Sequence, residues 1–148
     1  MTLVEMLVVL AIIGITASLA LLSIGVGSGA SGQTEAKRLE SRLQLAADQS
    51  MLRDEVLAIN LTPRSYSFAQ WDEATRKWVP STLALLGEVH ELPSGVELAS
   101  SDGQALVPLD LNAAAAPVEL TISAGQSRWT IGFDGLTAKV RNSSAKRP

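Results

Sequence analysis

The first 34 residues of this 148-residue chain contain one ionisable side chain, that of Glu5, and the 29 residues that follow Glu5 in this segment are uncharged. The other charged side chains all come after residue 34. Residues 6–24 are the most apolar stretch, and as a helix they would extend about 28 Å, close to the thickness of a bilayer core. The sequence therefore predicts an apolar helix ahead of a single globular part.

Three interpretations of this apolar segment compete. A cleaved signal peptide is disfavoured, because no Lys or Arg precedes the apolar run and the run is longer than such peptides use. An ordinary membrane anchor and a helix that leaves the membrane to pack against copies of itself both remain. The residues that flank the apolar run bear on the choice between these two interpretations.

Glu5 is the unusual residue, because a carboxylate that enters hydrocarbon costs about 2 to 3 kcal/mol at depth and less near the interface. One candidate partner is the α-amino group of Met1, one helical turn away. In a bundle of staggered parallel helices, that amine would instead meet the Glu5 of a neighbouring subunit. A third alternative leaves Glu5 among headgroups and water.

After the apolar run, residues 25–32 read GVGSGASG, and this glycine content predicts a break or a hinge. A helical pattern then resumes, with Ala36, Leu39, Leu43 and Ala46 on one stripe. Charged side chains occupy the other faces, and pairs such as Glu35 and Arg38 are expected to be mostly solvated.

From residue 56 the apolar pattern changes to a period of two, punctuated by turn residues, which predicts short antiparallel strands. The predicted strands span residues 56–61, 65–71, 77–80, 88–92, 96–100, 105–111, 118–123, 127–133 and 136–141. Asp134-Gly135 predicts a two-residue type I′ hairpin. The fold class is α+β, a long N-terminal transmembrane helix packed on an antiparallel β-sheet domain. The parts are 1–25 (apolar helix), 26–32 (linker), 33–58 (amphipathic helix) and 56–148 (β domain).

The start of the chain resembles a known family. Thr2-Leu3-Val4-Glu5, followed by an apolar run with Gly14, is similar to the N-terminal signature of type IV pilins and type II secretion pseudopilins. In that family a prepilin peptidase removes a leader and the new terminus is N-methylated. The resemblance implies that Met1 is the processed, methylated residue and that Glu5 is the assembly carboxylate. A removed basic leader would offset Lys37, Arg38 and Arg42, which otherwise favour a cytoplasmic position for that end.

The β domain of residues 56–148, called the head below, resembles the H-type minor pseudopilins, also called GspH or FimT-like. The resemblance lies in the order of its segments from VLAINLTPRSYSFAQW to RWTIGFDGLTAKV. The resemblance implies a pilin-like fold and a minor pseudopilin at or near the tip of the periplasmic pseudopilus of a type II secretion system. Expected partners are other minor and major pseudopilins, the inner-membrane secretion platform, the prepilin peptidase and inner-membrane lipids. The expected location is the bacterial inner membrane, single-pass, with the C-terminal domain in the periplasm.

The composition argues against disulfide bonds, most metal sites and most catalytic sites. The chain has no Cys and one His, which excludes a disulfide framework, a thiolate zinc site and a multi-histidine metal site. His90 lies between Glu88 and Glu91, and alternation on a strand leaves it two ligand types at most, so we interpret it as a solvated strand histidine. No acid follows Asp134, and no calcium loop is expected there. We predict no enzymatic activity, no cofactor and no metal.

Charge is segregated along the head. Residues 78–127 contain six acids and no Lys or Arg, whereas five basic residues follow. The basic residues Lys139, Arg141, Lys146 and Arg147 keep an alternative open, a FimT/FimU-like minor pilin of a type IV pilus that binds DNA during uptake. The net charge of −3 argues against nucleic acid as the partner. Unlike patches on the head would instead steer subunits together.

Overall fold

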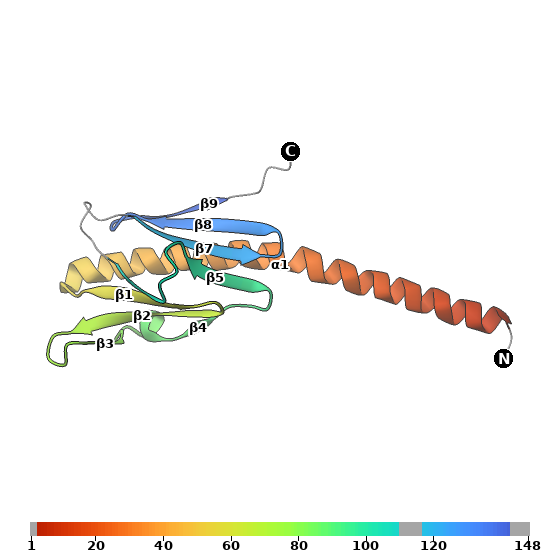
Figure 1. The fold of residues 1–148 in the computed structure, drawn as a ribbon, viewed down its shortest axis with the longest axis horizontal. Helices are drawn as coiled ribbons and strands as arrows, with labels where there is room; N and C mark the ends of the chain where they lie inside the picture. The colour runs from red at the N-terminus through yellow and green to blue at the C-terminus, as the bar shows by residue number, and fades with distance from the viewer. Residues whose placement is uncertain (1–2, 110–116, 143–148) are drawn as a thin grey trace.

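The computed structural model describes residues 3–109 and 117–142, and for residues 16–28 and 142 it describes the backbone alone. One long helix, α1 (Leu3–Arg53), begins as an arm that projects from the head and ends packed against it (Figure 1). Among the described residues, no helix has the length and apolar character needed to cross a membrane. The predicted span 6–24 lies partly outside that description, because it includes side chains from residue 16 onward.

The predicted break at residues 25–32 is wrong, because α1 is continuous through them. Gly32 shows why a glycine is present in the middle of this helix. A Cβ built on Gly32 would lie 2.7 Å from the Cβ of Ala124 and would overlap the ring of Trp129. The glycine therefore lets the helix backbone lie directly against the sheet, a close approach that only this residue permits.

The predicted helix over 33–58 ends early, at Arg53. Asp54 adopts a left-handed conformation with φ of 54°, and the N–H of Glu55 donates to the carbonyl of Ser50 at 3.3 Å. The hydroxyl of Ser50 donates in turn to the carbonyl of Glu55. This is the arrangement that closes a helix with a left-handed residue just past its end, and it frees residue 57 to start a strand.

The strands form two antiparallel sheets, and the period-two prediction is confirmed. The first sheet has the order β3-β2-β1-β6, with β4 also paired to β2, and the second has the order β5-β7-β8-β9. Their bounds are β1 (Leu57–Thr62), β2 (Ser65–Asp72), β3 (Lys77–Pro80), β4 (His90–Glu91), β5 (Val96–Ser100), β6 (Leu106–Pro108), β7 (Val118–Ala124), β8 (Ser127–Phe133) and β9 (Ala138–Asn142). A short helix, α2 (Ala84–Gly87), was not predicted. The α+β class is therefore observed.

The last hairpin differs from the predicted two-residue turn. Phe133 pairs with Ala138, which leaves residues 134–137 as the loop, and Gly135 but not Asp134 has a positive φ. The carboxylate of Asp134 accepts hydrogen bonds from the N–H groups of Leu136 and Thr137 and from the Thr137 hydroxyl. These bonds stabilise a longer loop, so the type I′ prediction is wrong and β9 begins at residue 138 rather than 136.

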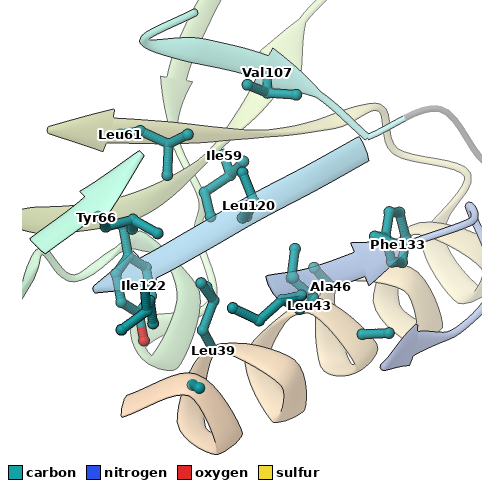
Figure 2. Packing of buried hydrophobic residues seen from close by; sticks show 14 of the residues in the cluster. Leu39, Leu43, Ala46, Ile59, Leu61, Tyr66, Val107, Leu120, Ile122 and Phe133 are labelled. Carbon is teal, nitrogen blue, oxygen red and sulfur yellow. The ribbon is translucent and has the colours of Figure 1, made fainter. Parts of the chain in front are cut away.

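The core lies where the C-terminal part of α1 meets both sheets (Figure 2). Leu39, Leu43 and Ala46 form the buried stripe of the helix, as their spacing predicts. They pack against Leu120 and other inward side chains of β7 and β8 on one side. Inward side chains of β1 and β2 pack from the other side. The fully buried large residues of those strands are Leu57, Ile59, Tyr66, Phe68, Leu120, Ile122, Ile131 and Phe133.

One edge of the second sheet is covered by helix side chains instead of a strand. The N–H of Val140 donates to Glu40 Oε1 at 3.1 Å, and the N–H of Ala138 donates to Gln44 Oε1 at 3.3 Å. Gln44 also donates from Nε2 to the carbonyl of Leu136 at 3.0 Å. The outward N–H groups of Ala138 and Val140 on β9 are thus bonded to α1, which protects this edge of the sheet.

Candidate functional site

The described side chains of the arm, those of residues 3–15 of α1, include apolar ones exposed on all sides of the helix. Residues 6–10 are consecutive and therefore span more than one helical turn, and each of their large side chains is exposed, Leu10 by 67%. The exposed apolar residues of this part are Leu3, Val4, Met6, Leu7, Val8, Val9, Leu10, Ile12, Ile13 and Ile15. A helix that is apolar all round is normally surrounded by other apolar groups. The arm therefore holds most of the exposed large apolar side chains of the described chain and is a candidate contact surface.

Glu5 lies in the first turn of α1, and its side chain is exposed. The N-terminal end of a helix carries partial positive charge, so this position is favourable for a carboxylate. Met1, the residue that the family resemblance marks as processed, lies outside the described residues. Which amine pairs with Glu5 stays a prediction.

Two of the four basic residues that the sequence analysis names as possible DNA contacts lie in the described part of the chain. Lys139 and Arg141 are exposed on β9, two residues apart, and so project from one face of the second sheet. That face is the one turned away from α1, because the alternate residues Ala138 and Val140 point toward the core. Lys146 and Arg147 lie outside the described residues. The structure therefore gathers two of the four basic residues on one surface.

The interpretation of His90 as a solvated histidine is wrong. His90 Nε2 lies 2.7 Å from Glu35 Oε2, and its side chain is 17% exposed. Arg38 Nη1 lies 2.9 Å from Glu35 Oε1, so the predicted turn-spaced pair forms, but Glu35 itself is buried rather than solvated. Glu35 thus bonds α1 to β4, a contact between residues 55 positions apart. A signal was present, because Glu35 stands four residues before Leu39 on the apolar stripe.

Tyr66 and Arg42 extend this partly buried polar cluster, which comprises Glu35, Arg38, Arg42, Tyr66 and His90. The Tyr66 ring packs on the His90 ring, with the two ring centroids 5.1 Å apart. The Arg42 guanidinium lies over the Tyr66 ring, 5.5 Å from its centroid. The Tyr66 hydroxyl and Arg42 Nη1 are buried, and neither has a hydrogen-bond partner among the described residues. The cluster fixes the helix on the first sheet.

Burial raises the pKa of Tyr66 from 10 to about 12. The folded state therefore favours the neutral phenol of Tyr66. The stabilisation that follows from this pKa difference is present below pH 10, where the unfolded chain also keeps the proton, and is lost as the pH rises from 10 to 12. We expect the free energy of unfolding to fall by about 2 to 3 kcal/mol across that interval. Tyr66 is the only tyrosine, so tyrosinate absorbance reports on it alone. Tyr66→Phe should remove this part of the alkaline destabilisation, and an equal loss in that variant would contradict the assignment.

The tryptophans divide between core and surface. Trp129 is buried against α1, whereas Trp71 and Trp78 are directly paired on β2 and β3 and half-buried, with ring centroids 5.3 Å apart. Tyr66 and Phe68 are buried on one face of β2, and alternation along the strand places Trp71 on the opposite face. The paired tryptophans therefore form part of the outer face of the first sheet.

Comparison with known proteins finds a relative. Over 108 residues the chain is 33% identical to type II secretion system protein H from Pseudomonas aeruginosa. This match confirms the resemblance to the H-type pseudopilins. It covers 72% of this chain and 60% of that protein, so the chain spans less than two thirds of the relative's length. No family model and no solved structure matches the chain. The H-type resemblance implied a helix packed on antiparallel strands, which is the arrangement observed.

Proposed function

We propose that this chain is a minor pseudopilin of a type II secretion system, a non-catalytic subunit at or near the tip of the periplasmic pseudopilus. The observation that carries the proposal is the contrast between a head with a complete core and an arm whose apolar side chains are uncovered. Neighbouring helices of a filament would bury such an arm. The relative's name refers to type II secretion and not to a type IV pilus, which favours this reading over the DNA-uptake alternative.

In this proposal the arm has two successive environments. Before assembly, residues 6–24 anchor the chain in the bacterial inner membrane, with the head in the periplasm. After processing at Met1, the arm leaves the membrane and packs among the helices of other pseudopilins on the secretion platform. Glu5 then pairs with the terminal amine of an adjacent subunit, because in an apolar helix bundle an unpaired carboxylate is costly.

Replacing Glu5 with alanine tests this role. We expect Glu5→Ala to remain in the membrane fraction but to enter filaments at least about tenfold less than the parent, because the neighbour's amine then loses its partner. Filaments sheared from cells and quantified by immunoblot provide the measurement. Glu73→Ala, which removes an exposed loop acid of the head, serves as the control and should assemble normally. Normal assembly of Glu5→Ala would contradict the role assigned to Glu5.

A further inference from the structure

A shallow groove of about 430 Å³ lies between α1 and the start of β9. The ionisable side chains in its lining are two acids, Glu40 and Asp48, and no described cation lines it. Glu40 accepts a hydrogen bond from the N–H of Val140, and Asp48 accepts one from Gln44 Nε2 at 3.2 Å. Among the described residues, neither acid is in an ion pair. The lining residues are Glu40, Ser41, Gln44, Leu45, Asp48 and Ala138.

The cations of the neighbouring elements lie elsewhere. Lys139 and Arg141 project from the face of the second sheet that is turned away from α1. Arg38 and Arg42 belong to the polar cluster on the first sheet. Lys37 precedes Glu40 by about one helical turn and does not line the groove. The groove therefore presents two carboxylates that no described cation balances.

Two cations of the chain lie outside the described residues, and both follow β9. Of the 12 Lys and Arg residues, these are Lys146 and Arg147, in the segment 143–148. The segment contains no acid, so its charge is opposite to that of the groove. Because β9 forms one wall of the groove through Ala138, the basic segment is tethered to the element that it would contact.

The tether is long enough to reach both acids. Ala138 is bonded to Gln44 and Val140 to Glu40, so two residues along β9 correspond to four along α1 in the opposite direction. Continued by two residues, this register places residue 142 beside about residue 36 of the helix, about 18 Å along the axis from Asp48. The six residues 143–148, when extended, span about 20 Å. A segment that turns back along α1 therefore brings its cations to the groove.

We propose that residues 143–148 fold back along α1 and occupy this groove, with Lys146 and Arg147 paired to Glu40 and Asp48. The tether raises the effective concentration of the segment at the groove, so that exposed ion pairs, weak by themselves, are sufficient. The half-buried side chain of Leu45 adds an apolar contact. The two cations are then neutralised within the chain instead of being presented to DNA. This docking does not depend on the secretion role.

Disulfide trapping tests the proposal directly, because the chain has no cysteine of its own. Full-length chain in detergent that carries Ser41→Cys and Ala145→Cys is oxidised with glutathione disulfide at low salt, and the intrachain disulfide is quantified by peptide mass spectrometry. Thr130→Cys with Ala145→Cys is the matched control. Thr130 lies beside Arg141 on the outer face of the second sheet, so distance along the chain favours the control. Docking should nevertheless make the Ser41 disulfide form at least about fivefold faster.

Charge variants in the same cysteine background show whether the acids select the segment. Lys146→Glu with Arg147→Glu should remove the rate advantage, and Asp48→Lys should reduce it. Asp48 is exposed, whereas Glu40 is left unchanged because its carboxylate holds β9. Combining the three substitutions should restore part of the advantage, and about 0.5 M NaCl should reduce it in the parent background.

Three results would overturn the proposal. The first is an equal rate of disulfide formation for the two cysteine pairs. The second is a faster Ser41 disulfide that does not respond to the charge substitutions, because the acids would then not select the segment. The third is a disulfide that joins two chains at Ser41 in place of the intrachain one, which would assign the groove to a second copy.

Discussion

Replacing Gly32 with alanine is expected to lower the free energy of unfolding by about 2 to 3 kcal/mol. Alanine normally stabilises a helix relative to glycine, but here its Cβ would lie 2.7 Å from the Cβ of Ala124 and overlap the Trp129 ring. Both contacts are with side chains of the second sheet, and the Cβ of Ala124 is fixed directly to the β7 backbone, so the helix and the sheet must separate to admit one methyl group. Urea unfolding of the parent and the variant, followed by tryptophan fluorescence, measures the difference.

Gly29 provides a control of opposite sign in the same helix. A Cβ there would meet only the Ser127 hydroxyl at 3.8 Å, an ordinary contact. Gly29→Ala should therefore stabilise the protein by about 0.5 to 1 kcal/mol through helix propensity alone. Combining Gly32→Ala with Trp129→Leu should recover part of the loss, because the smaller side chain vacates the space. Equal effects of the two glycine substitutions would show that close packing does not select Gly32.

Replacing Glu35 with alanine should cost a comparable amount, about 3 kcal/mol. The carboxylate is 4% exposed and receives charge-assisted contacts from Arg38 at 2.9 Å and from His90 at 2.7 Å. Its removal leaves His90 without its acceptor. Arg38 contributes less to this cost, because it is 47% exposed and can turn to water.

A double-mutant cycle with His90→Ala isolates the contact between α1 and β4. The cost of Glu35→Ala should be smaller by 1 kcal/mol or more, on the order expected for a coupled pair, when His90 is already absent. Additive costs would mean that Glu35 stabilises the helix through Arg38 alone.

Strands were predictable because their signal is local. Alternation along residues 65–71 and turn residues around them are visible in the sequence, and the structure has the strand within one residue of that range. The buried stripe of Leu39 and Leu43 was predictable for the same reason, since spacing along a helix determines which side chains share a face.

The errors at Gly32 and at the pair of Glu35 and His90 concern contacts with residues far along the chain, whereas the error at the last hairpin is local. Helix propensity predicts a break at Gly32, because it contains no information about Trp129. The sequence predicts that Glu35 and His90 are each solvated, because only the folded chain brings the two side chains together. At the last hairpin, the side chain of Asp134 determines the loop through bonds that the Asp-Gly pair alone does not specify.

The covered edge of β9 also has a mechanical consequence. Glu40 and Gln44 hold consecutive outward amides of this strand, and the strand runs alongside the helix, so a displacement of α1 along its axis would break both contacts together. A slide of half a turn, about 2.7 Å, would take both acceptors away from the edge amides. Tension applied to the arm would therefore load these bonds in parallel as a shear joint, which resists more than bonds that open one after another. In a filament that is pushed and pulled, the head would move as one body with its helix.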